Sequence, residues 1–170
     1  LIAASGLVAS RLNTPLNLVL AGTLKGADPD QVAAMVPPGV NAITHFEYIA
    51  DEYLQMWYKT LDIAVFPYRR ILNSGSVFLS TTFGIPSILP DEPSLEAEFS
   101  QEPWVSFYST SDNIPTEELL AQQIVKTLRS DLEAKSLAAR TYAREHTPYQ
   151  MSKAYTDLVD EITGESMRNA

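Results

Sequence analysis

The chain has 170 residues, 45% of them hydrophobic and 19% charged, which indicates a folded domain with a full hydrophobic core. It carries 12 basic and 21 acidic residues, and the net charge of -9 argues against a broad nucleic-acid-binding surface. The sequence has no cysteine, which excludes disulfides, thiolate nucleophiles and cysteine-ligated metals and agrees with a cytoplasmic location.

Helices and strands are predicted to alternate over the first two thirds of the chain. Hydrophobic periodicity and capping residues predict, in chain order, a helix at 1–12, a strand at 16–21, a helix at 28–36, a strand at 40–46, a helix at 51–61, a strand at 62–66, a helix from about 77 to 83, and strands at 87–89 and 104–108. This order predicts the fold class: α/β, a three-layer Rossmann-like domain with a parallel sheet and right-handed crossovers.

From Thr116 onward the pattern is helical, with segments ending near Ser130, Glu145 and Ile162. Because no strands separate these helices, we expect them to pack on one side of the sheet or against a partner domain. Apolar runs are shorter than the roughly 20 residues that span a bilayer. The start at residues 1–9 has neither a positive leader nor an initiating Met, so we expect an N-terminally truncated piece of a longer protein.

Two loops that follow predicted strands carry candidate ligand-binding residues, because parallel sheets bind ligands at the carboxyl ends of their strands. The first loop runs from Gly22 to Gly26 and includes Lys25. Its glycines permit close backbone approach, and the lysine offers a positive charge. The alternative is an ordinary connection between a strand and a helix.

The second loop is Pro67 to Ser76, with Arg69 and Arg70 at one end and Asn73-Ser74-Gly75-Ser76 at the start of a helix. A helix N-terminus with free backbone N–H groups, two hydroxyls and nearby arginines suits a diphosphate. The alternative is that Asn73 or Ser74 caps the helix and both arginines are solvated. The Walker pattern and Gly-x-Gly-x-x-Gly are both missing, which disfavours a P-loop NTPase and an ordinary dinucleotide dehydrogenase.

Residues 53–91 resemble the C-terminal domain of GT-B glycosyltransferases, in particular the large retaining group 1, or family 4. The shared pattern is an acidic helix with Tyr58, a strand that ends in Pro67, a loop and helix, and then Gly84-Ile85-Pro86-Ser87-Ile88 and Asp91. Gly22 and the last predicted helix, from Tyr149 to Ile162, fit the same domain. The resemblance implies a nucleotide-sugar-binding domain at 1–147 and, at 148–170, a crossover helix and tail.

The resemblance implies a domain that binds the nucleotide diphosphate sugar of a glycosyltransferase, in bacterial surface glycan synthesis, with no metal or other cofactor. It implies phosphate contacts from Gly22, Lys25, Arg69, Asn73, Ser74, Gly75 and Ser76, and nucleobase or ribose contacts from Tyr48, Ile49 and Glu96. Its partners would be the nucleotide sugar and a missing N-terminal GT-B domain, with no nucleic acid and no transmembrane segment. The catalytic groups would lie in that other domain, so the isolated chain is expected to be inactive, and the full-length protein to be cytoplasmic or membrane-peripheral.

Two features depart from the family pattern. The family's paired glutamates align with Ile71 and Leu79, and its Arg and Lys that grip the diphosphate would lie upstream of Leu1. A subset of bacterial surface-polysaccharide transferases has a similar loop, in which the Ser-Gly-Ser turn would anchor the phosphates. The missing glutamates leave open a non-catalytic nucleotide-sugar-binding or interaction module. A sugar-nucleotide 2-epimerase and a receiver domain are weaker alternatives, because their acidic residues are not found.

Other polar residues have competing interpretations. His45 ends a predicted strand, where a capping or partly buried role is favoured over a functional one, and His146 is expected to contact the last carbonyls of a helix. Glu92, Glu96 and Glu98 are predicted to form an acidic loop, either solvated or lining the donor cleft. The rings of Trp57 and Tyr58 are expected to pack in the core.

Overall fold

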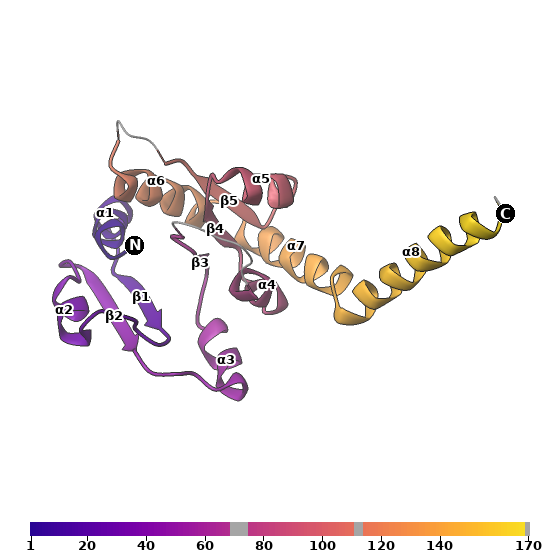
Figure 1. The fold of residues 1–170 in the computed structure, drawn as a ribbon. Coiled ribbons are helices and arrows are strands. Elements are labelled where there is room, and N and C mark those ends of the chain that lie inside the picture. The colour runs from indigo at the N-terminus through magenta and orange to yellow at the C-terminus, as the bar shows by residue number, and fades with distance from the viewer. Residues whose placement is uncertain (69–74, 111–113, 169–170) are drawn as a thin grey trace.

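The computed structural model of the chain describes residues 1–68, 75–110 and 114–168. The helices are α1 (Ile2–Leu12), α2 (Pro29–Ala34), α3 (Asp51–Tyr58), α4 (Gly75–Thr82), α5 (Pro93–Phe99), α6 (Thr116–Leu128), α7 (Leu132–Glu145) and α8 (Pro148–Arg168). The strands are β1 (Leu16–Ala21), β2 (Val40–His45), β3 (Ala64–Val65), β4 (Ser87–Pro90) and β5 (Val105–Tyr108). The predicted α/β class is confirmed, and each predicted strand is present (Figure 1).

All strand pairs are parallel, but the strands form two sheets. One sheet has the order β1-β2, with Leu16 opposite Val40, and the other has the order β3-β4-β5, with Ser87 between Ala64 and Val105. Sequence patterns predict strands one at a time and do not contain the pairing between them. For this reason the split between β1 and β3 was not expected.

Helices cover both faces of the three-stranded sheet. Successive residues of a strand point to opposite faces, and the neighbours Ile88 and Leu89 of β4 enter two different clusters of buried side chains. Ile88 packs with α1 and α6, whereas Leu89 packs with α4, α5 and α7. This arrangement gives the predicted three-layer, Rossmann-like architecture.

Of the two arrangements expected for the C-terminal helices, a shared side of the sheet is wrong for α6 and α7, whereas contact with a partner domain stays a prediction. Leu120 and Ile124 of α6 lie in the Ile88 cluster, whereas Ala139 and Tyr142 of α7 lie in the Leu89 cluster. The chain changes face in the short turn between Arg129 and Asp131, where Asp131 caps α7 by accepting a hydrogen bond from Ala134 N at 2.9 Å. Each helix therefore covers a different apolar face of the three-stranded sheet.

Helix α5 replaces the acidic loop that was predicted around Glu92, Glu96 and Glu98. Pro93 occupies the first turn, where its missing N–H costs no hydrogen bond. Leu95 and Phe99 lie four residues apart on one helical face and are 4% and 2% exposed. The sequence pattern did not indicate this helix, because its two buried apolar residues are set among three glutamates.

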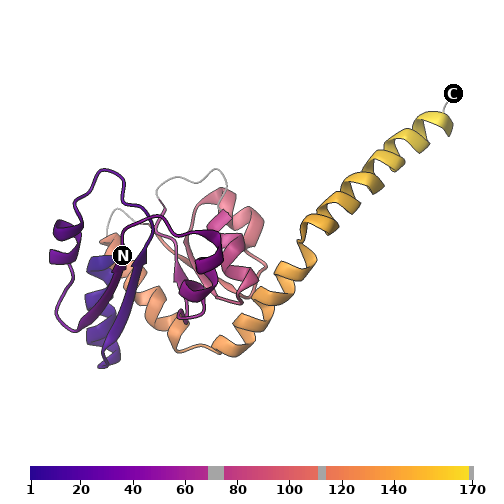
Figure 2. The ribbon, with the colours of Figure 1, turned by 90° about the horizontal axis from the view of Figure 1, so that it is seen from below.

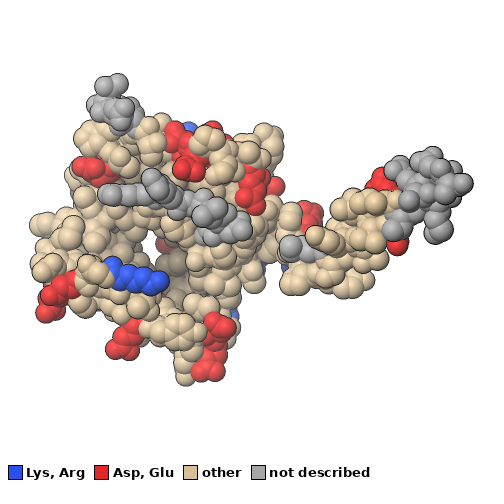
Figure 3. Space-filling model, viewed as in Figure 1, with Lys and Arg blue, Asp and Glu red and all other residues tan. Residues whose placement is uncertain are grey.

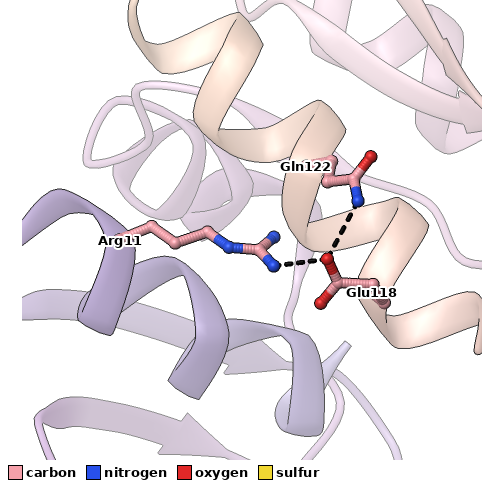
Figure 4. A network of polar contacts seen from close by, with 3 residues as sticks. All are labelled: Arg11, Glu118 and Gln122. Atoms are coloured by element: carbon pink, nitrogen blue, oxygen red, sulfur yellow. Dashed lines mark hydrogen bonds and ion pairs between the residues drawn. The ribbon is translucent and has the colours of Figure 1, made fainter.

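The two sheets are joined through their helices. Helix α1 packs on α6 as well as on β1 and β2, and Ala4 and Val8 of α1 are fully buried in the Ile88 cluster. At this contact the Arg11 guanidinium forms an ion pair with Glu118, whose carboxylate also accepts a hydrogen bond from Gln122 Nε2 at 2.9 Å (Figure 4). The hydrogen bonds from Gln122 and Arg11 lower the pKa of Glu118.

Helix α8 extends away from the rest of the molecule in both ribbon views (Figures 1 and 2). Its described side chains are exposed, and Tyr155, Leu158, Val159 and Ile162 form an apolar stripe at helical spacing. None of the helices in the described part of the chain combines the length and apolarity needed to cross a membrane.

Candidate functional site

The two sheets are separate, and Figure 1 shows β1 on the side of its sheet nearer β3, an arrangement similar to the topological switch point of a single open sheet. From β1 the chain proceeds outward to β2, and from β3 it proceeds the other way through β4 to β5. In open α/β sheets, ligands bind outside the carboxyl ends of the strands at such a point. Figure 3 shows an opening through the molecule between the β1–β2 half and the β3–β5 half, with a basic side chain at its border.

The loop after β1 borders this switch point and is shaped by its glycines. Gly22 and Gly26 have φ of 119° and 74°, which L side chains rarely adopt. The Gly22 N–H donates to the His45 carbonyl at 2.9 Å, which closes the β1–β2 pair at its carboxyl end. A Cβ at Gly22 or Gly26 would meet nothing within 4 Å, so backbone conformation requires these glycines and the space beside them is open.

Lys25 lies in the same loop with an exposed side chain and forms no ion pair with the described residues. Its ammonium is therefore available to an anion at the switch point. This position agrees with the predicted phosphate contact and equally with a solvated loop lysine.

On the other side of the switch point, α4 begins at Gly75. Gly75 and Ser76 form its first turn, both are exposed, and a Cβ at Gly75 would meet nothing within 4 Å. The predicted phosphate ligands Arg69, Asn73 and Ser74, together with Arg70 and Ile71, lie outside the described residues. Of the predicted phosphate contacts in this loop, the structure therefore describes Gly75 and Ser76.

Tyr58 fixes the start of α4 against α3. Its hydroxyl donates to the Ser76 carbonyl at 3.3 Å, and its ring stacks on Phe83 with centroids 5.2 Å apart. Burial of the phenol, with a smaller contribution from Tyr68, raises the pKa of Tyr58. Tyr58 is partly buried and packs on Phe83, which agrees with the predicted packing role, but it lies outside both buried clusters. The hydrogen bond to α4 is an addition that helical spacing did not indicate.

The predicted nucleobase residues follow β2. Tyr48 is 76% exposed and Ile49 is half-buried. Just before them, His45 is partly buried, with its ring centroid 5.3 Å from that of Trp57. This favours the packing role over the functional role for His45.

Glu96 and Leu79 lie on the two helices beyond β3. The Glu96 side chain is exposed in the first turn of α5, the helix that follows β4. Leu79, at a position where the resembling family carries a glutamate, is half-buried in α4. Among the predicted donor contacts, Glu96 is the one that carries a carboxylate, and it lies within the described residues.

Asp91, which follows β4, connects two loops through its carboxylate. Its carboxylate accepts hydrogen bonds from Ser109 Oγ at 2.8 Å, Thr110 N at 3.0 Å and Thr110 Oγ1 at 3.1 Å. Burial opposes ionisation of this group, but the hydrogen bonds from Ser109 and Thr110 together outweigh it and lower the pKa of Asp91. Because its oxygens are occupied, Asp91 joins the loops after β4 and β5 and is poorly suited to act as a general base. The Ser-Thr pair after β5 was the sequence signal that could have indicated this role.

Gly84, part of the Gly-x-Pro pattern of the resemblance, has a structural explanation. It follows α4 with a φ of 71°, and a Cβ there would clash with Arg140 Nε and lie 2.9 Å from Ser136 Oγ of α7. This glycine therefore permits the close packing of α4 on α7.

A scan against models of known protein families finds no match for this chain, and neither does a search of curated proteins. Among the described residues, no group of three or more His, Asp or Glu side chains is arranged to hold a metal ion. His146 contacts the Tyr142 carbonyl through Nδ1 at 2.8 Å and stacks on the Tyr142 ring, in agreement with its predicted structural role.

The predicted contacts that the structure describes all follow strands in the chain: Gly22 and Lys25 follow β1, Tyr48 and Ile49 follow β2, Gly75 and Ser76 follow β3, and Glu96 follows β4. Their convergence on one ligand stays a prediction.

Proposed function

We propose that this chain is the donor-binding domain of a glycosyltransferase that uses a nucleotide diphosphate sugar. The observation that carries this proposal is the switch point between β1 and β3, flanked by the open glycine loop with Lys25 and by the N-terminus of α4. A diphosphate placed there would receive the partial positive charge of the helix and the ammonium of Lys25. Tyr48 and Ile49 would contact the nucleobase, and Glu96 the ribose or sugar.

In this proposal the chain stabilises the leaving group. When the bond between the sugar and the diphosphate breaks, negative charge grows on the phosphate oxygens, and fixed dipoles and cations near those oxygens lower the barrier. Ser76 and Gly75 would present backbone N–H groups, with Lys25 on the opposite side of the opening. The acceptor and its activating groups would come from a separate domain.

The decisive measurement is a calorimetric titration of the full-length protein with UDP, GDP and ADP. We expect one of them to bind with a dissociation constant below millimolar. Failure of all three to bind at millimolar concentration would overturn the donor assignment.

A matched pair of substitutions locates the site. Ser76→Glu places a negative charge in the first turn of α4, which the helix dipole tolerates but a bound diphosphate would not. Ser94→Glu makes the same change in the first turn of α5, where Ser94 is also exposed. We expect Ser76→Glu to abolish nucleotide binding and Ser94→Glu to preserve it. Equal affinities in the two variants would place the site elsewhere.

The alternative of a non-catalytic nucleotide-sugar-binding module is favoured by one observation, the apolar Leu79 at a position where the family carries a glutamate. The two functions separate in an assay of the full-length protein with the nucleotide sugar that binds. Release of nucleotide diphosphate in the presence of acceptor supports the transferase. Binding without turnover, across acceptors of the surface-glycan class, supports the module.

A further inference from the structure

Helix α3 leads the chain from one sheet to the other. It follows β2 of the two-stranded sheet and precedes β3 of the three-stranded sheet, and both ribbon views show it between the two-stranded sheet and α4 (Figures 1 and 2). None of its residues is buried, so α3 lacks the buried apolar face that fixes α1 and α6. Its position therefore depends on a small number of side-chain contacts.

Trp57 of α3 contacts the two-stranded sheet. Its ring lies against His45 at the carboxyl end of β2, with the ring centroids 5.3 Å apart and the planes at 35°. The backbone carbonyl of His45 accepts a hydrogen bond from the Gly22 N–H at 2.9 Å. The residue that meets Trp57 therefore also anchors the start of the glycine loop after β1.

The next residue, Tyr58, contacts the three-stranded half of the molecule. Its hydroxyl donates to the Ser76 carbonyl in the first turn of α4 at 3.3 Å, and its ring stacks on Phe83, directly after α4, with centroids 5.2 Å apart. Adjacent residues of a helix point about 100° apart around its axis. For this reason Trp57 and Tyr58 can reach two different halves of the molecule from a single turn of α3.

We propose that α3 sets the separation between the glycine loop after β1 and the start of α4, with Trp57 and Tyr58 as the positioning residues. The α1–α6 contact joins the two halves through their helices, whereas α3 joins them where β2 ends and α4 begins. A ligand that contacts both loops needs them at one separation, so a loosely held α3 would reduce the fraction of molecules ready to bind. This consequence for binding rests on the proposed function, but the separation itself does not.

The distance between two spin labels, measured by pulsed electron paramagnetic resonance, tests this proposal. The sequence contains no cysteine, so the labels attach to introduced cysteines alone. Thr44→Cys on β2 and Thr82→Cys on α4 place one label in each half, at exposed positions of regular elements. We expect a single narrow distance distribution when the rest of the chain is unchanged.

Substitutions at two neighbouring residues of α3 provide the matched comparison. Trp57→Ala removes the ring from His45, whereas Met56→Ala changes a side chain that is 63% exposed. We expect Trp57→Ala to broaden the distance distribution, Met56→Ala to leave it narrow, and Trp57→Phe, which keeps a ring against His45, to restore it. A loss of stability alone would not give this pattern, because the distance is measured in the molecules that remain folded.

His45→Ala removes the same ring contact from the side of β2. It is expected to broaden the distribution as Trp57→Ala does, and it keeps the experiment decisive if Trp57→Ala does not fold. Tyr58→Ala releases α4 from the other end of the connection and should have the same effect.

Three outcomes would overturn the proposal. A narrow distribution in folded Trp57→Ala or His45→Ala would mean that other contacts set the separation. Equal broadening in Met56→Ala would mean that any change in α3 has this effect. A broad distribution before any substitution would mean that the two halves are not held at one separation.

Calorimetry with UDP, GDP and ADP, on the full-length protein with the same substitutions, separates this proposal from the proposed function. If Trp57→Ala leaves about a tenth of the molecules at the binding separation, the dissociation constant of the nucleotide that binds is expected to rise about tenfold. Unchanged affinity with a broadened distribution would contradict the link between separation and binding. A narrow distribution without any nucleotide binding would remove the proposed function and leave the positioning role of α3 in place.

Discussion

Single residues at the carboxyl edge divide into two groups by whether their side chains are packed against the rest of the chain or exposed. Asp91, Tyr58 and Gly84 are engaged by Thr110, Ser76 and Arg140 respectively. Lys25 and Ser76 present exposed side chains next to the switch point. Substitutions in the first group are expected to change stability, and substitutions in the second group to change binding.

Gly84→Ala is expected to destabilise the fold by about 1–3 kcal/mol, because the new Cβ both adopts a left-handed φ and meets Arg140. Gly26→Ala is the matched control, since Gly26 also has a positive φ but has open space around it. Chemical denaturation of the two variants measures the difference. An equal loss of stability in both variants would show that Arg140 and Ser136 of α7 move aside without a cost in free energy.

Asp91→Asn is expected to lower the stability by about 1 kcal/mol near neutral pH, a value reduced by partial solvent exposure. The native pKa of Asp91 is lowered, so its contribution is present above the unfolded value of about 3.9 and is lost as the pH falls through the native pKa. Denaturation curves of both proteins from pH 7 to pH 2 should therefore converge in acid. A difference that does not change with pH would contradict the role given to the ionised carboxylate.

At the scale of elements, the sequence predicted what local patterns encode. The strands β1 and β4 are indicated by apolar runs, and the helices α1 and α6 by helical periodicity. Helix α5 was missed because Leu95 and Phe99 are its two buried apolar residues, set among glutamates. The pairing of strands and the faces taken by α6 and α7 depend on contacts between distant segments, which local patterns do not contain.

For the candidate site, the sequence predicted the loops but not their supports. Gly22, Lys25 and Ser76 follow directly from the rule that ligands meet the carboxyl ends of parallel strands. The hydrogen bond from Tyr58 to α4 and those from Ser109 and Thr110 to Asp91 link residues 18 or 19 positions apart. Such supports become visible only when the elements are placed in space.

Tyr58→Phe tests the support of α4 by α3. The variant keeps the ring stacked on Phe83 and removes the hydrogen bond to the Ser76 carbonyl, so we expect a loss of about 0.5–1 kcal/mol in unfolding free energy. If α4 binds the diphosphate, nucleotide affinity should fall as well. Tyr155→Phe, on the exposed part of α8, is the control and should change neither quantity. Wild-type stability in Tyr58→Phe would mean that stacking alone holds the two helices together.

At the scale of the whole molecule, the chain consists of a packed α/β body and a helix that leaves it. Pro148 begins α8 directly after the turn at His146, where the imidazole packs on Tyr142. The described side chains of α8 from Ser152 to Ile162 are exposed. The body should therefore fold without α8, whose own helicity would be marginal in isolation.

Truncation after Thr147 is expected to leave the melting temperature within a few degrees of that of the longer chain, because few contacts are removed. Truncation after Ser130 also removes α7 and uncovers the cluster of Leu89 and Trp104, so it should abolish cooperative unfolding. Circular dichroism melts of the three chains give the comparison. A large loss of stability from the first truncation would show that α8 folds back on the body.

The contact between α1 and α6 has a mechanical consequence. Because α1 joins the two sheets among the described residues, we expect α1, β1, α2 and β2 to open together when this contact breaks, which would expose the buried Ala4 and Val8. The Arg11–Glu118 pair lies at this contact and is partly exposed, so ionic strength weakens it. We therefore expect added salt to increase how often this unit opens.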